Sequence, residues 1–316
     1  TGGDFDTIEA GLVAAGVLEA LGFRIVVEVY PGDYYENNPL PMPEHVAVHC
    51  PGSHETTRLF CLNNGVGQHG IVLATDTEIN GLQVRSATGV NAAGFHFPAG
   101  IHDSELHDCK VNDCYIGYLS EASASDAAIL VRDAHASGGS FTSMFKVAAG
   151  GQMGVWGAVQ TGAAIATNWL HADGAGSHLR VHGSRLIGTN TTNALFLENT
   201  GVIEAGDTHL DGATNGIVVA ASGGTADVTA CDFTSTAFDL ILANTALATA
   251  RFHATSLDSS KMSVGANAVI TGYGQDISAA TPGTTVVGEL WSGANPAERV
   301  PLATYTRSTA STSWVS

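Results

Sequence analysis

The feature that most constrains the fold of this chain is an internal repeat. Three apolar segments, "NALFLEN" (193–199), "NGIVVAA" (215–221) and "FDLILAN" (238–244), follow one another at intervals of 22 and 23 residues between their central residues 196, 218 and 241. Short segments of alternating apolar and polar residues lie between them and recur at a similar spacing. A repeat of this length, with Gly, Asn or Asp at the corners and no helix, predicts a parallel β-solenoid whose turns rise by about 4.8 Å.

The composition agrees with this interpretation. Charged residues make up 13% of the 316 residues, and 38 residues are glycine, which suits tight turns between strands better than charged surface helices. Leucine-rich repeats have a similar period, but their asparagine-leucine consensus is absent. We therefore expect an all-β chain that forms one elongated domain, because each repeat of a solenoid contacts only its neighbours.

The chain begins with the one segment that predicts a helix. Asp6 followed by Glu9 has the spacing of a capping box, and Gly22 supplies a C-terminal stop. The apolar residues between them recur at helical spacing: Ile8, Leu12, Val13, Val17 and Leu21. Residues 1–22 are therefore predicted to form a capping helix over the first strands.

The segment "VVEVYPGDYYENNPLPMP" (26–43) is interpreted as the first turn of the solenoid. Its apolar alternation breaks at Pro31-Gly32 and again at Asn37-Asn38-Pro39. Proline cannot donate to a ladder hydrogen bond, so these positions are expected at bends between strands.

The same part of the chain resembles a known superfamily. The segments "GDFDTIEAGLVAAG", "RIVVEVYPGDYYENNPLPMP" and "HVAVHCPGSHETTRL" look like the entry of right-handed parallel β-helix proteins of the pectate-lyase-like superfamily. Within this superfamily, the segment "YYENNPLPMP" is most similar to the sequences of phage tailspikes and other virion-surface β-helices. The resemblance implies the fold, but this scaffold carries lyases, hydrolases and non-enzymatic spikes, so it does not fix an activity.

Three regions are expected along the chain: the capping helix at 1–22, the β-helix at 23–270, and a C-terminal cap at 271–316. The last region loses the repeat and carries widely spaced aromatic residues among Ser and Thr. Tails of this kind in the phage proteins that the chain resembles pair with partner chains, which implies a homotrimer. A loosely attached extension is the alternative.

Charge and segment composition exclude several classes of function. A net charge of −18 with three lysines argues against nucleic acid as a partner, because phosphate binding needs clustered Lys and Arg. No apolar run is long enough to span a membrane, and residues 1–25 lack the pattern of a signal peptide. The five cysteines show neither disulfide nor zinc-site spacing and are expected to be buried free thiols.

One candidate metal site lies in "HDSELHDCKVNDC" (102–114). Asp103, Glu105 and Asp108 offer carboxylates beside His102 and His107. In a strand, Asp103, Glu105 and His107 would share one face, which could hold calcium or an acid/base pair. The alternative is a solvated outer face with aspartates at corners. No other cofactor is expected.

One candidate catalytic pair comes from aligning "AGDTHL" (205–210) with "ACDFTS" (230–235). This alignment stacks Asp207 over Asp232 on successive turns, with Glu204 nearby. Two carboxylates one turn apart would separate their pKa values by repulsion, as hydrolytic pairs do. Corner positions favour aspartate in any case, so a structural role is the alternative.

Two hypotheses for function follow. The first is a structural, trimeric virion-surface protein of a phage, which contacts other virion proteins and binds host polysaccharide without cleaving it. The second is a polysaccharide hydrolase or lyase on the same scaffold. Four aromatic residues could stack on sugar rings: Tyr34, Tyr35, Trp156 and Trp169.

Overall fold

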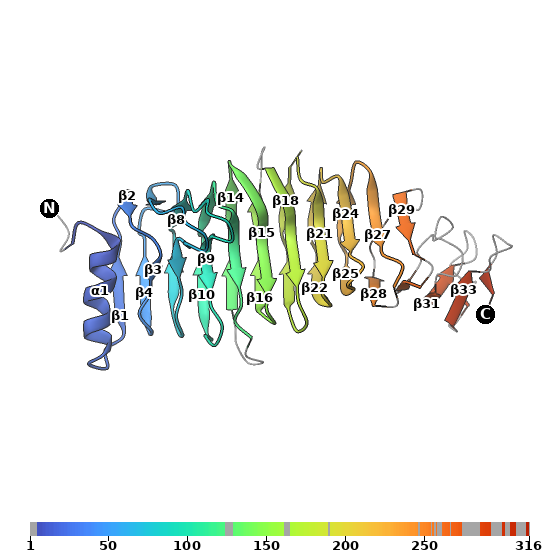
Figure 1. The fold of residues 1–316 in the computed structure, drawn as a ribbon, viewed down its shortest axis with the longest axis horizontal. Helices are drawn as coiled ribbons and strands as arrows, with labels where there is room; N and C mark the ends of the chain where they lie inside the picture. The colour runs from blue at the N-terminus through green and yellow to red at the C-terminus, as the bar shows by residue number, and fades with distance from the viewer. Residues whose placement is uncertain are drawn as a thin grey trace.

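In the computed structural model the protein is a single rod, formed by the stacked turns of a β-solenoid (Figure 1). The structure describes residues 5–123, 129–160, 165–188, 190–245, 247–253, 255, 257, 261–265, 267–273, 285–291, 299–300, 304–307 and 314–315. Successive strands along the chain belong in rotation to three sheets, which we call A, B and C, and nine turns of the described chain have a strand in all three. None of the helices within these ranges has the length and apolar character that crossing a membrane requires.

Sheet A contains β1 (Ile25–Glu28), β4 (Val46–His49), β7 (Glu78–Asn80), β10 (Ser104–His107), β13 (Ile129–Arg132), β16 (Gln152–Trp156), β19 (His178–His182), β22 (Gly201–Gly206), β25 (Gly224–Thr229), β28 (Ala248–His253), β30 (Val269–Tyr273) and β31 (Thr285–Trp291). Sheet B contains β2 (Gly32–Glu36), β5 (Thr57–Cys61), β8 (Gln83–Arg85), β11 (Lys110–Asn112), β14 (His135–Ser137), β17 (Val159–Gln160), β20 (Arg185–Ile187), β23 (His209–Asp211) and β26 (Asp232–Thr234). Sheet C contains β3 (Leu40–Pro41), β6 (Ile71–Val72), β9 (Ala93–Phe97), β12 (Ile116–Ser120), β15 (Ser140–Ala148), β18 (Ile165–Asp173), β21 (Asn193–Glu198), β24 (Asn215–Val219), β27 (Phe238–Leu242) and β29 (Met262–Val264).

The pairing within each sheet is parallel through these turns, and the repeat seen in the sequence is the repeat of the structure. The three segments that define the period lie in register on β21, β24 and β27, where Leu195 pairs with Ile217 and Ile217 with Leu240. The predicted parallel β-helix is therefore confirmed.

Inward side chains stack in ladders that form one continuous core. In sheet A the ladder runs through Val48, Ile79, Leu106, Val131, Val155, Val181, Ala205, Val228 and Phe252. In sheet C the rings of Phe95, Tyr118 and Phe145 stack with centroids 5.5 and 4.9 Å apart, all fully buried. A row of asparagines follows on the next turns: Asn193 donates to Asn168 at 2.8 Å and Asn215 donates to Asn193 at 2.9 Å. Asn168 and Asn193 are buried and Asn215 is half-buried.

The N-terminal helix α1 (Ile8–Glu19) covers the first turn, as predicted (Figure 1). Its N-cap is Thr7, whose hydroxyl accepts from the Ala10 N–H, so the capping-box assignment to Asp6 was wrong by one residue. The Ile8 N–H donates to the buried Glu36 carboxylate of β2 at 2.7 Å, which places a negative charge at the positive end of the helix.

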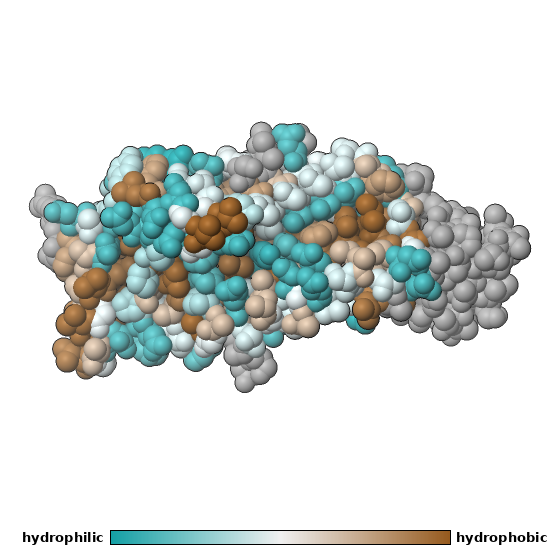
Figure 2. Space-filling view, viewed as in Figure 1, coloured by the Kyte–Doolittle hydropathy of each residue, from teal (hydrophilic) through white to brown (hydrophobic). Residues whose placement is uncertain are grey.

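The apolar face predicted for the helix divides into two parts. The buried residues of α1 are Ile8, Gly11, Leu12 and Ala15. Val13, Val17 and Leu21 are exposed instead, and Figure 2 shows hydrophobic surface at this end of the rod. The helix therefore covers the core with a narrower face than the sequence predicted.

The C-terminal region departs from the parallel pattern after β31. This strand pairs in parallel with β30, and then antiparallel with β32 (Arg299–Val300) and β33 (Thr304–Arg307), which pairs with β34 (Trp314–Val315). The expected boundary near residue 270 and the role of 271–316 in a trimer remain predictions.

All five cysteines are free and buried, as expected. Burial raises the pKa of Cys50, Cys109 and Cys114 to about 12 and that of Cys231 to about 11. The thiolate is the reactive form of cysteine, so these thiols act as core residues.

Candidate functional site

A shallow groove of about 180 Å³ lies on the outer face of sheet A, across β13, β16 and β19. The buried Gly154 lies beneath its centre, in register between Leu130 on one side and Arg180 on the other. Gln152 and His178 also line it, from β16 and β19. The groove therefore offers an apolar side and a polar side across three neighbouring strands.

The indole ring of Trp156 packs directly over Gly154. A Cβ at Gly154 would lie 2.1 Å from a ring carbon of Trp156, so only glycine leaves room for the indole here. The Arg132 guanidinium lies 5.8 Å from the indole centroid, and the His182 ring lies 6.2 Å from it. The ring therefore lies between side chains of the two neighbouring strands, Arg132 of β13 and His182 of β19.

The carboxylate beside the groove already has an arginine partner. Glu204 lies 3.0 Å from Arg180 Nε, and His178 Nε2 also lies 3.0 Å from it. Its register partner on the next turn is Asp227, which lies 3.8 Å from Arg251. The ion pair with Glu204 positions Arg180 on the polar side of the groove, where its guanidinium can donate hydrogen bonds to a ligand.

A second polar cluster lies on the outer face of sheet C. Lys146 Nζ lies 3.1 Å from Asp173, and His171 Nε2 lies 3.1 Å from Glu198. Asp173 and Glu198 occupy matched positions on β18 and β21. The structure thus places two carboxylates, a lysine and a histidine on neighbouring strands, a cluster that the sequence did not predict.

The two carboxylates of this cluster have opposite pKa shifts. Burial raises the pKa of Glu198, and the nearby Asp173 charge adds to that effect. Burial also works to raise the pKa of Asp173, but hydrogen bonds from Asn199 and Lys146 outweigh it and the pKa is lowered overall. Carboxyl pairs of this kind can divide the roles of acid and base.

Burial lowers the pKa of His171 to about 4, and that of His69 also to about 4. An unfolded histidine has a pKa near ~6.5, so between these values the unfolded chain binds protons that the folded chain does not. We expect the free energy of unfolding to fall as pH drops from about 6.5 to about 4. Urea unfolding at several pH values measures this.

The matched variants for that measurement are His171→Gln and His102→Gln. We expect His171→Gln to remove part of the wild-type pH dependence, and His102→Gln replaces a half-exposed histidine as the control for the substitution itself. If the free energy of unfolding depends on pH equally in His171→Gln and in the wild type, the prediction is contradicted.

The carboxylates predicted to bind metal each contact a different histidine. Asp103 lies 2.9 Å from His102, and Glu105 lies 2.9 Å from His107. Asp108 instead contacts His54 from a distant loop. The structure therefore does not bring Asp103, Glu105 and Asp108 together in one cluster.

The predicted stacking of Asp207 over Asp232 is wrong in register by two residues. Asp232 pairs with His209, whose Nδ1 lies 3.0 Å from its carboxylate. Asp207 occupies the corner before β23, with φ of 48°. Glu204 is held by Arg180 as described above, so the three candidates do not form one group.

The four aromatic candidates have different surroundings. Trp169 is fully buried and Tyr34 is half-buried, with its hydroxyl donating to the Tyr30 carbonyl at 2.8 Å. Tyr35 is exposed on sheet B and stacks on Phe60. Trp156 lines the groove on sheet A, and Tyr34 lines a second cavity of about 960 Å³ between α1 and β1.

Comparison with known proteins places this geometry on a known fold. No family model matches the chain, and no curated protein sequence does. The Dettilon tailspike protein matches with a TM-score of 0.51 and 9% identity, over 88% of this chain and 61% of that one. The chain is a right-handed parallel β-helix. Two further structures match at lower scores: the A-module of the Azotobacter vinelandii mannuronan C-5 epimerase AlgE6 (TM-score 0.47, 10% identity, 90% of this chain and 86% of that one) and ORF18 of Geobacillus virus E2 (0.46, 12%, 85% and 53%).

Proposed function

We propose that this protein is a surface component of a phage particle that binds host polysaccharide along the side of its rod without cleaving it. The observation that carries the proposal is the groove on sheet A, which is lined by an indole packed over Gly154 and by an arginine side chain. The β-helix shared with the Dettilon tailspike supports the choice of a phage surface protein as the class.

The two sides of the groove match the two kinds of surface on a sugar ring. A pyranose has apolar C–H faces, which suit Leu130 and Trp156, and hydroxyls, which suit Gln152, His178 and Arg180. No carboxylate is among the described residues that line the groove, and the nearby Glu204 forms an ion pair with Arg180. This combination favours binding over catalysis.

Removal of the indole is expected to weaken glycan binding. Replacing Trp156 by alanine leaves the groove without its largest apolar surface, and we expect the Kd for fragments of the host polysaccharide to rise about tenfold or more. Isothermal titration with purified oligosaccharides measures it.

The matched control is Tyr35→Ala, which removes an exposed aromatic residue from sheet B. Its Kd should equal the wild-type value. If Trp156→Ala binds the oligosaccharides with the wild-type affinity, or if only Tyr35→Ala loses affinity, the glycan does not bind in the groove.

The proposal includes a homotrimer and contacts with other virion proteins, through the region 271–316. The antiparallel strands β32, β33 and β34 interrupt the parallel stack in this region and distinguish it from the body of the rod. Light scattering on the purified chain should give three times the monomer mass, and a monomer at all concentrations would contradict this part.

A second candidate function, a polysaccharide hydrolase or lyase, is favoured by the sheet C cluster. Asp173 and Glu198 have the opposite pKa shifts that an acid/base pair needs, and Lys146 and His171 lie beside them. Release of reducing ends or unsaturated products, lost in Glu198→Gln, would support this candidate against binding alone. If turnover is lost in Asp207→Asn or Asp232→Asn instead, the catalytic role belongs to those residues.

A further inference from the structure

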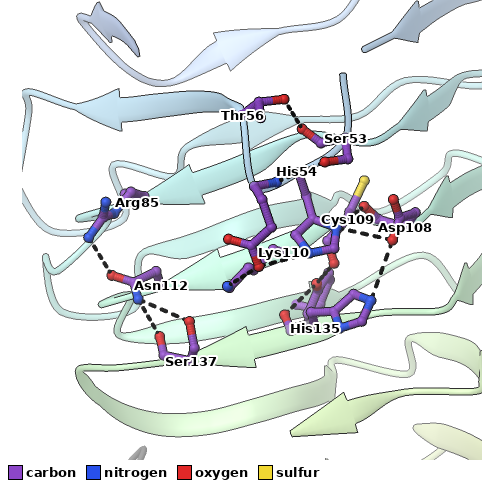
Figure 3. A network of polar contacts seen from close by, with 12 residues as sticks. Ser53, His54, Thr56, Arg85, Asp108, Cys109, Lys110, Asn112, His135 and Ser137 are labelled. Carbon is purple, nitrogen blue, oxygen red and sulfur yellow. Dashed lines mark hydrogen bonds and ion pairs between the residues drawn. The ribbon is translucent and has the colours of Figure 1, made fainter. Parts of the chain in front are cut away.

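Three side chains from three turns of the solenoid converge at the corner between sheets A and B (Figure 3). They are His54 in the loop between β4 and β5, Asp108 between β10 and β11, and His135 on β14. Asp108 Oδ1 lies 3.0 Å from His54 Nδ1 and 3.4 Å from His135 Nε2. One nitrogen or oxygen from each residue lies within 4.8 Å of the others.

The fold brings these residues together because one loop passes over a neighbouring turn. Residues 50–56 lie over Gly81, where a Cβ would meet the Cys50 carbonyl at 2.8 Å. The absence of that Cβ lets His54 reach Asp108, two turns further along the rod. From inside the core, the buried Tyr118 hydroxyl lies 2.9 Å from the Cys109 carbonyl and 3.2 Å from the His135 carbonyl, and so anchors the backbone of both.

His54 faces a carboxylate with each of its ring nitrogens. Nδ1 lies 3.0 Å from Asp108 and Nε2 lies 3.2 Å from Glu55, while Lys110 Nζ lies 2.7 Å from the same Glu55 oxygen. A neutral imidazole carries one proton, so it can satisfy only one of these carboxylates. Nδ1 also lies 3.0 Å from the Asp108 backbone carbonyl, so a ring with its proton on Nδ1 donates to Asp108. A ring with its proton on Nε2 instead points the Nδ1 lone pair at Asp108, and a cation can then lie between them.

We propose that His54 Nδ1, Asp108 Oδ1 and His135 Nε2 bind a divalent transition-metal ion of the zinc class. Ligand atoms about 2.0–2.1 Å from a tetrahedral zinc ion lie about 3.3 Å from one another, close to the two distances between Asp108 and the histidines. Two imidazoles and one carboxylate suit zinc, cobalt or nickel, whereas calcium takes oxygen ligands.

The residues around the site would orient one ligand, balance the local charge and leave room for a water molecule. Glu55 accepts from His54 Nε2 and so turns the lone pair of Nδ1 toward the ion, as carboxylates do for zinc-bound histidines. Lys110 is neutralised by Glu55, which leaves the charge of Asp108 for the ion. The Asp108 side chain is 43% exposed, so a water molecule can reach the fourth position. The ion would tie the second, fourth and fifth turns together.

The test is a titration of the whole protein, freed of metal by a chelator, with zinc and separately with calcium. We expect saturable 1:1 zinc uptake by calorimetry, a rise in the unfolding temperature with zinc, and no response to calcium at the same concentrations. Cobalt should give the visible absorption of a tetrahedral site with nitrogen ligands, which reports the ligands without any substitution.

Asp108→Asn and His54→Gln should each lower the zinc affinity at least tenfold. Asparagine tolerates the left-handed φ of 49° at position 108, so the first variant keeps the corner. The matched control is Asp207→Asn, the same corner position in a later turn with φ of 48°, which should bind zinc as the wild type does. No 1:1 uptake by the wild type, or unchanged uptake in Asp108→Asn and His54→Gln, would contradict the proposed site.

Discussion

Replacing Phe145 by alanine is expected to lower the free energy of unfolding by about 3–5 kcal/mol. Phe145 is fully buried on β15, and its ring stacks on Tyr118 with centroids 4.9 Å apart. The substitution removes both the buried apolar surface and the stacking contact, and the neighbouring turns cannot close the cavity without shifting the strand spacing. Urea unfolding followed by circular dichroism measures the loss.

The matched control for this prediction is Phe196→Ala. Phe196 lies on the outer face of the same sheet, half-buried beside His171. Because part of its surface already contacts solvent, its removal should cost well under half of the effect at Phe145. Similar losses at the two positions would contradict the assignment of inner and outer faces.

Replacing Asn193 by alanine is expected to cost about 2–5 kcal/mol, the second largest effect. Asn193 donates to Asn168 and accepts from Asn215, and its side chain is 8% exposed. The alanine variant leaves the buried acceptor on Asn168 without its partner, which costs about 1–3 kcal/mol, and the half-buried donor on Asn215, which costs about 1–2 kcal/mol. Thermal and urea unfolding of the purified variant provide the measurement.

The position of each asparagine in the row gives an internal control. Asn215 makes one of these two bonds and is half-buried, so Asn215→Ala should cost about half as much as Asn193→Ala. A larger loss at Asn215 would mean that the row does not act as a chain of hydrogen bonds.

The fold could be predicted from the sequence because the repeat appears in both. A solenoid needs the same inward residue type at the same place in every turn, and Leu195, Ile217 and Leu240 fulfil this at spacings of 22 and 23 residues. The capping helix could be predicted only in part. Its periodicity is that of a helix whichever side is buried, and contacts with the first turn decide that Val13 and Val17 face outward.

The candidate sites could not be predicted in the same way, because their residues come from different turns. Aligning the similar letters around Asp207 and Asp232 gave a register that differs by two residues from the observed one. Aligning the inward residues Leu210 and Phe233 would have placed Asp232 beside His209. Asp108 was singled out, but its partner His54 reaches it through a loop whose path the repeat does not encode.

The sheet C cluster lies where the repeat is hardest to follow. Around residues 134–176 the paired residues Phe145, Leu170 and Leu195 lie 25 residues apart, instead of the 22 and 23 of the later turns, so the period changes within the chain. The register between Asp173 and Glu198 follows only from the paired strands, so their proximity could not be inferred beforehand.

The measurement that tests the proposed function most directly is a structure of this protein with a bound fragment of the host polysaccharide. We predict an intact oligosaccharide in the groove on sheet A, with a sugar ring against Trp156 and hydroxyls near Arg180. A fragment over Asp173 and Glu198 on sheet C, or one found cleaved, would contradict it.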